Sequence, residues 1–130
     1  MLIDSNIIIY AAKPEHGALR TLVAEEVPAV SAISYVEVLG YHRLTAEERG
    51  YFEEFFAAAN VLDLSRPVLD EAIRLRQLRK ISLADALVAA KALVHGLTLV
   101  TRNTEDFAWI ADLSLLNPFA SVQSSSSYQT

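Results

Sequence analysis

Four acidic residues stand where a carboxylate could do chemistry: Asp4, Glu37, Asp85 and Asp106. Asp4 interrupts an apolar N-terminal segment, and Asp85 carries the only charge in the apolar run Leu83–Ala90. A helix that is apolar all round is buried, and a buried carboxylate costs free energy unless it is paired or binds a metal ion. An aspartate in a first helical turn gains only about 0.3–1 kcal/mol from the helix dipole. Asp85 therefore favours a functional site over a structural one.

Each acid also has a structural interpretation, because short polar and acidic side chains cap helices. Asp4 can cap the helical turn that follows it. Ser34 and Glu37 have the spacing of a capping box, in which Glu37 would reach back to the Ser34 amide. Asp85 also lies three residues after a serine, and Asp106 lies in what looks like an ordinary helix start. When each acid is considered alone, a capping role explains Glu37 and Asp106 better than a catalytic role does. For Asp4 the two interpretations are about equally good.

The elements that must position these acids alternate between short apolar runs and helical patterns. This alternation predicts an α/β fold with a mostly parallel sheet of four or five strands. The expected strands are residues 2–3, 28–33, 60–64, 97–101 and, as a fifth, 113–116. The expected helices are residues 7–12, 18–26, 34–44, 45–59, 65–79, 82–94 and 104–110. We expect Ser5 or Asn6 to cap the first helix, Thr45 to open its helix with a capping box, Gly96 to end the helix that begins after Ser82, and Thr104 to cap the last helix.

The positions of the acids relative to these strands favour a shared site. Asp4, Glu37 and Asp106 follow the carboxyl ends of predicted strands, and Asp85 opens the helix that leads into the fourth strand. In an open α/β sheet these ends lie along one edge, where ligands bind. Carboxylates that meet there repel one another unless cations neutralise them. An all-oxygen site suits Mg²⁺ or Mn²⁺, and such ions clamp phosphates and lower the pKa of bound water.

The composition as a whole limits the alternatives. The chain has 130 residues, which fits one domain. It contains no cysteine, which excludes disulfides, thiolate zinc sites and a cysteine nucleophile. The N-terminus does not resemble a secretory signal, and no apolar stretch reaches the roughly 18 residues of a membrane span, so we expect a cytoplasmic protein. The net charge of −5 argues against nucleic-acid binding through bulk positive charge, although two divalent cations would bring it to −1.

At the acidic residues the sequence resembles a PIN domain, and more narrowly a VapC-type toxin of a bacterial or archaeal type II toxin–antitoxin pair. The matching segments are Leu2–Asn6, Ser31–Glu37, Leu83–Ala90 and Leu97–Phe107. Each segment alone is a weak signal, but their order and spacing agree over roughly residues 1–118. Ser5 stands where a threonine is commoner in the family, and the hydroxyl is kept.

The resemblance implies a PIN-like three-layer sandwich over residues 1–118, followed by a polar, serine-rich tail at 119–130. It implies a metal-dependent endoribonuclease that hydrolyses RNA phosphodiesters to 5′-phosphate and 3′-hydroxyl ends, usually as a homodimer. A small antitoxin would inhibit it by covering the acidic site. The four acids would hold Mg²⁺ or Mn²⁺ and carry catalysis. Four further residues would orient them or position water, because ligating carboxylates need such partners: Ser5, Asn6, Thr101 and Asn103.

Contacts to RNA and to other proteins require further residues. Arg79 and Lys80 lie just before Asp85, and Arg102 lies just before Asp106, so these three are candidate phosphate contacts. The structural interpretation of Arg79 and Lys80 is favourable placement of positive charge at a helix C-terminus, with solvated side chains. The helix that includes Tyr51, Phe52, Phe55 and Phe56 should bury these rings. Part of the apolar helix surface, with Tyr35, Leu39 and Tyr41, could instead bind an antitoxin helix or a second subunit.

Three other functions stay open on the sequence. The chain could be a stand-alone PIN nuclease in RNA maturation or a DNA nuclease. It could also be a non-catalytic binding module in which the acids are structural caps.

Overall fold

The computed structural model describes residues 1–25 and 29–119, and in them a five-stranded, all-parallel sheet has the order β3-β2-β1-β4-β5. The strands are β1 (Leu2–Ile3), β2 (Ala29–Ser31), β3 (Asn60–Leu62), β4 (Leu99–Val100) and β5 (Leu115–Leu116). The chain first builds outward from β1 through β2 to β3, and then crosses to the other side of β1 for β4 and β5. This reversal creates a crevice at the carboxyl ends of β1 and β4, which is where open α/β sheets bind ligands.

The helices of the described residues account for most of the fold and agree with the expected α/β class. They are α1 (Ser5–Ala11), α2 (Gly17–Glu25), α3 (Ala32–Leu39), α4 (Ala46–Ala58), α5 (Arg66–Leu78) and α6 (Leu83–His95), with 3₁₀ turns at Pro14–His16 and Thr104–Asp106. All five expected strands form, each shorter than predicted or equal to it. None of the helices formed by residues 1–25 and 29–119 is long and apolar enough to cross a membrane.

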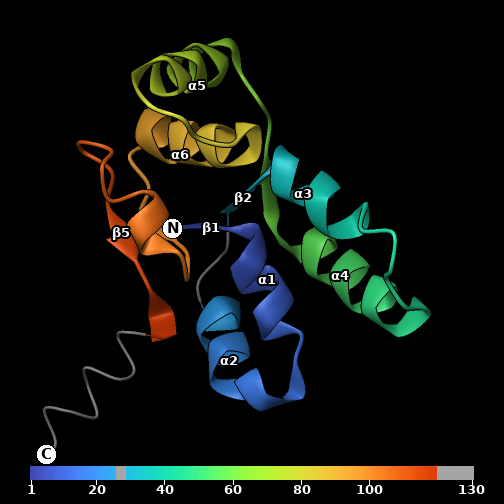
Figure 1. The fold of residues 1–130 in the computed structure, drawn as a ribbon. Coiled ribbons are helices and arrows are strands. Elements are labelled where there is room, and N and C mark those ends of the chain that lie inside the picture. Colours follow the sequence, from blue (N-terminus) through green and yellow to red (C-terminus); the bar gives the residue numbers. More distant parts are fainter. Residues whose placement is uncertain (26–28, 120–130) are drawn as a thin grey trace, which may run out of the picture.

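The helices cover both faces of the sheet, so that the fold has three layers (Figure 1). Successive residues of a strand point to opposite faces, and β1 illustrates this. Leu2 packs in a core with residues of α5 and α6, whereas Ile3 packs in a second core with residues of α1 to α4. Both residues are fully buried. Phe52 and Phe56 of α4 are buried in the second core, as predicted, whereas Tyr51 and Phe55 are only partly buried against it.

The starts of α1 and α3 differ from the predictions. Asp4 caps α1, as its structural interpretation predicts, and Ser5 and Asn6 do not: the Asp4 carboxylate accepts a hydrogen bond from the Ser5 amide. Helix α3 begins at Ala32, two residues before the predicted start, because Ser31 is its cap and accepts a hydrogen bond from the Ile33 amide. Ser34 is therefore an interior, fully buried residue of α3, and the capping box predicted for it is wrong.

The predictions for Thr45 and Gly96 are confirmed, and the one for the last helix is wrong. Thr45 and Glu48 form the expected capping box of α4. Gly96 ends α6 in the left-handed conformation, with φ of 62°. The helix expected over residues 104–110 is reduced to the 3₁₀ turn Thr104–Asp106, and Thr104 is its first residue and not its cap. The serine-rich tail lies outside the described residues, apart from Phe119.

Candidate active site

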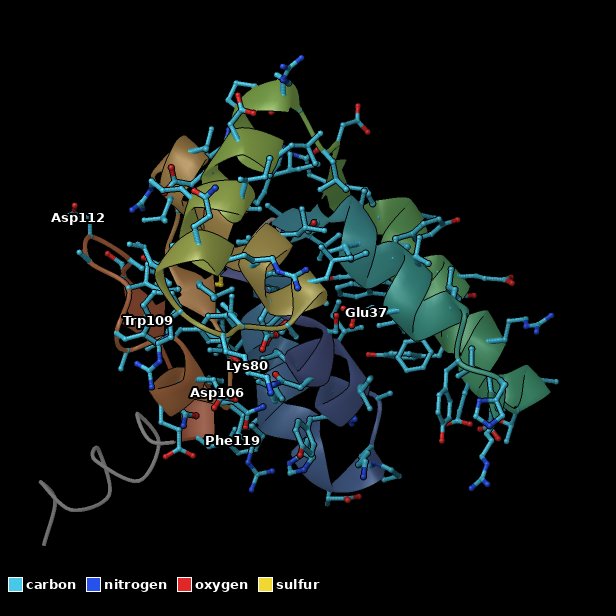
Figure 2. All side chains as sticks on the ribbon, turned by 45° about the horizontal axis from the view of Figure 1, so that its top comes forward. Glu37, Lys80, Asp106, Trp109, Asp112 and Phe119 are labelled. Atoms are coloured by element: carbon cyan, nitrogen blue, oxygen red, sulfur yellow. The ribbon has the colours of Figure 1, made fainter. Side chains whose placement is uncertain are left out.

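The four predicted acids line one hollow at the carboxyl edge of the sheet, with a volume of about 240 Å³. Asp4 follows β1, Glu37 lies on α3, Asp85 lies in the first turn of α6, and Asp106 lies in the 3₁₀ turn after β4. Figure 2 shows Glu37 and Asp106 on these separate elements. The hollow is also lined by three of the predicted supporting residues, Ser5, Asn6 and Asn103. Thus the topology gathers residues that are up to about a hundred positions apart.

Asp4 is the most buried of the four acids, with 7% of its surface exposed. Its carboxylate accepts two hydrogen bonds, from the Ser5 amide at 2.8 Å and from the Thr101 hydroxyl at 2.9 Å. Burial raises the pKa of Asp4, the two hydrogen bonds lower it, and the nearby charges of Asp85 and Glu37 raise it again. The net shift is upward, because the effect of burial outweighs that of the two hydrogen bonds.

Thr101 connects Asp4 to the segment that follows β4. Its side chain is fully buried. While the hydroxyl donates to Asp4, its oxygen accepts from the Asn103 amide at 3.2 Å and from Asn6 Nδ2 at 3.4 Å. The predicted orienting role of Thr101 therefore has a direct geometric basis, although Thr101 itself does not line the hollow.

Glu37 is held from a different element. The Ser5 hydroxyl donates a hydrogen bond of 2.8 Å to Glu37 Oε1. Because α3 begins at Ala32, Glu37 lies in the second turn of the helix, too far along it to cap the helix start. The capping interpretation of Glu37 is thus removed, and its carboxylate is free to face the other acids.

Asp85 lies in the first turn of α6, whose residues 86–92 are buried as the apolar sequence predicts. The Ser82 hydroxyl accepts a hydrogen bond from the Asp85 amide and so caps the helix. Burial raises the pKa of the Asp85 carboxyl, a hydrogen bond with Ser82 lowers it, and the charges of Asp106 and Glu37 raise it. The capping role belongs to Ser82, so the carboxylate of Asp85 need not serve as a cap.

The chemistry of these donors fits a hard divalent cation. The hollow offers carboxylate, amide and hydroxyl oxygens, which are the ligands that Mg²⁺ and Mn²⁺ prefer. The side-chain oxygen of Asn6 is buried and has no hydrogen-bond partner among the described residues. None of the four acids forms an ion pair with a residue of the described segments. Among the described residues, no three His, Cys, Asp or Glu side chains lie close enough together to hold a metal ion as they stand. A bound cation would therefore have to bring the acids closer to one another.

A family model described as PIN domain matches residues 1–113 of the chain. The chain belongs to the PIN domain family. PIN domains are typically nucleases that use a divalent metal. The five-stranded parallel sheet flanked by helices agrees with this assignment.

Solved structures of toxin–antitoxin complexes are similar to this PIN domain. A toxin–antitoxin complex from Klebsiella pneumoniae matches with a TM-score of 0.71 and 29% identity, over 90% of this chain and 96% of that chain. VapBC-1 from nontypeable Haemophilus influenzae matches with a TM-score of 0.72 and 25% identity, over 89% and 96%.

A third structure, VapBC2 from Rickettsia felis bound to a promoter DNA fragment, matches with a TM-score of 0.77 and 23% identity, over 89% of this chain and 96% of that chain. At that identity the match shows a shared fold alone. No curated protein sequence matches significantly.

The predicted RNA contacts of the PIN domain fall in two places. Arg79 and Lys80 line a second hollow of about 330 Å³, which shares Asp85 and Asp106 with the first. Arg102 lines neither of these hollows: its guanidinium lies 4.8 Å from the ring centroid of Tyr10 and 4.7 Å from that of Phe119. A phosphate contact by Arg102 stays a prediction.

The sequence reasoning did not single out Trp109, which also lines the second hollow. Two features of the sequence could have pointed to Trp109: it is the only tryptophan of the chain, and it lies three residues after Asp106. Its indole N–H donates a hydrogen bond of 3.0 Å to the Asp106 carbonyl oxygen.

Proposed function

We propose that this PIN domain is a divalent-metal-dependent endoribonuclease that acts as the toxin of a type II toxin–antitoxin pair. The observation that carries the proposal is the convergence of Asp4, Glu37, Asp85 and Asp106 on one oxygen-lined hollow. The likeness to the Klebsiella pneumoniae toxin–antitoxin complex supports the toxin role.

The four acids would hold Mg²⁺ or Mn²⁺ in the hollow. When bound, the cation supplies positive charge that attracts a phosphodiester and lowers the pKa of nearby water. Asp4 is oriented for this by Thr101 and by the Ser5 amide, and Glu37 is oriented by the Ser5 hydroxyl. Ser5 therefore fixes two of the acids relative to each other, one through its backbone and one through its side chain.

An apolar surface formed by α3 and the residues directly after it supports a protein partner for this toxin. Tyr35, Val36 and Tyr41 expose 45%, 63% and 52% of their surface. Beside them, Tyr35 and Phe56 line a hollow of about 330 Å³ between α3 and α4. Aromatic residues are enriched where proteins bind one another. We propose that a small antitoxin or the second subunit of a homodimer covers this surface.

The nuclease proposal is tested by incubating the purified full chain with pooled cellular RNA in Mg²⁺, Mn²⁺ or EDTA. Asp4→Asn is prepared in parallel. Asp70→Asn is the matched control, because it removes an exposed carboxylate on α5 that lines neither of the two hollows at the acids. We expect cleavage by the native chain and by Asp70→Asn in either metal, with loss in EDTA and in Asp4→Asn.

Two results would contradict the proposal. Equal cleavage by Asp4→Asn and the native chain would mean that the activity does not depend on the acidic hollow. Products with 2′,3′-cyclic phosphate ends would exclude hydrolysis by metal-activated water, which leaves a 5′-phosphate and a 3′-hydroxyl.

The toxin role needs a separate test in cells. We expect expression of the native chain to arrest growth, expression of Asp4→Asn to be harmless, and co-expression of a small adjacent gene to restore growth. Cleavage in vitro without any growth arrest would instead favour a stand-alone nuclease.

A further inference from the structure

We propose that Arg79, Lys80 and Trp109 form a subsite for one unpaired nucleotide of the RNA, next to the acidic hollow. In this subsite the base stacks on the Trp109–Arg79 pair, and Lys80 contacts a phosphate. The inference rests on the proposed function, and it names the residues that hold one nucleotide beside the acids.

The first observation is the shape of the surface between α5, α6 and the segment after β4. The hollow of about 330 Å³ lies within the roughly 300–1,000 Å³ typical of ligand pockets. Its lining includes Asp85 and Asp106, which also line the acidic hollow. Figure 2 shows Lys80, Trp109 and Asp106 near one another on this side of the molecule. A strand held at the acids therefore extends directly into this second hollow.

The second observation is the stacking surface. The guanidinium carbon of Arg79 lies 5.4 Å from the centroid of the Trp109 ring. Trp109 is half-buried: it packs against the core while it also lines the hollow. Its indole N–H is bonded to the Asp106 carbonyl, which holds the ring in one orientation. Unpaired bases stack on both aromatic rings and arginine planes, so this pair offers a preformed platform.

The third observation is the state of the positive charges. Arg79 and Lys80 are exposed, and neither is in an ion pair with a residue of the described segments. By contrast, Arg66 and Arg74 of α5 are paired with Asp70 and Glu71. Cations that are not engaged with protein carboxylates are available for phosphates. They also offset the negative charge of the acids beside them, which would otherwise repel RNA.

Trp109 is the chain's only tryptophan, so its fluorescence reports on this subsite alone. A short single-stranded oligoadenylate is titrated into the full chain in EDTA, and the same strand is titrated as a duplex with oligouridylate. We expect the single strand to quench the fluorescence. The duplex should quench much less, because its base faces are covered. Quenching by the duplex to the same extent, or no quenching by the single strand, would overturn the proposal.

Variants separate stacking from charge, with binding measured by the anisotropy of a labelled oligoadenylate. Trp109→Leu should weaken binding about tenfold, whereas Trp109→Phe, which keeps an aromatic face, should stay close to the native chain. Arg79→Ala should weaken binding about fivefold. Lys80→Ala should lower the slope of log affinity against log salt by about 0.7. Arg66→Ala is the control, because it removes the same charge at the other end of α5.

Arg79→Ala and Lys80→Ala change exposed residues, so they test the proposal even if Trp109→Leu folds poorly. Weakening by Arg66→Ala equal to that by Arg79→Ala would overturn the subsite. The titrations in EDTA require neither metal binding nor cleavage. Quenching by a chain that does not cleave RNA would therefore reject the nuclease and keep the subsite. Cleavage with native KM by Arg79→Ala and Trp109→Leu would reject the subsite and keep the nuclease.

Discussion

Thr101→Val tests the link between fold and site, because it replaces a buried hydroxyl with a methyl group of similar size. The hydroxyl donates to Asp4 and accepts from the Asn103 amide. The change leaves an Asp4 oxygen without its donor and the amide without its acceptor. A hydrogen bond to a charged group contributes about 1.5–3 kcal/mol. We therefore expect the free energy of unfolding at neutral pH to fall by about 2 kcal/mol, measured by urea denaturation.

The effect of Thr101→Val should depend on pH. The bond from Thr101 favours the charged form and so lowers the pKa of Asp4, which burial holds above its ordinary value. Removing the bond raises the folded-state pKa further and leaves the unfolded-state pKa unchanged. The destabilisation by Thr101→Val is therefore largest at pH values above the folded-state pKa of Asp4 in both the native chain and the variant. It shrinks as the pH falls through these two pKa values toward the ordinary value of 3.8, where a neutral carboxyl gains only about 1 kcal/mol from the bond.

Metal affinity gives the second measurement on Thr101→Val. Removing a partner that orients a ligand typically weakens metal binding 10- to 100-fold, so the Mg²⁺ or Mn²⁺ dissociation constant from calorimetry should rise by about tenfold or more. Thr101→Ser is the matched control, since it keeps the hydroxyl and loses about 1 kcal/mol with its buried methyl group. If Thr101→Val binds metal as Thr101→Ser does, the hydroxyl does not orient a ligand and the reasoning fails.

Three further predictions concern charge, burial and backbone conformation. Asp4→Asn without metal should raise the melting temperature at neutral pH. Burial raises the pKa of Asp4, so the native carboxylate destabilises the fold above that pKa. The gain should shrink as the pH falls through this pKa and vanish near the ordinary value of 3.8. Lys91 is 3% exposed and donates to the Asp63 carbonyl, so Lys91→Met should lower stability by about 1 kcal/mol in urea denaturation and Lys91→Ala by about 3 kcal/mol. Gly96→Ala should cost about 1 kcal/mol in the same assay, from its φ of 62° alone, because an added Cβ meets nothing within 4 Å.

A different result would contradict each of these predictions. An Asp4→Asn variant with the native pH profile would mean that Asp4 is not the group whose burial matters. Equal losses for Lys91→Met and Lys91→Ala would mean that the hydrogen bond, and not the packed aliphatic stem, carries the effect. Gly96→Asn should cost less than Gly96→Ala, because asparagine tolerates the left-handed conformation, and the reverse order would contradict the strain argument.

The start of α3 shows where sequence patterns stop being decisive. Ser31 and Ser34 lie three residues apart, and each could cap the helix. The pairing of β2 with β3 runs to Ser31, and α3 begins directly after it. Ser34 is thereby drawn into the helix interior. Because the choice depends on strand pairing and burial, the local capping pattern around Glu37 predicted a helix start that the fold does not use.

The sequence by itself determined the α/β class, the Thr45 capping box and the glycine stop at Gly96, and it marked the four acids as candidates, because periodicity, capping and charge are local properties. Only the tertiary structure decided which side chains meet. The sheet order β3-β2-β1-β4-β5 brings Ser5 to Glu37 over 32 residues and Thr101 to Asp4 over 97. No local pattern encodes that order, since it is set by how the two faces of the sheet are buried together.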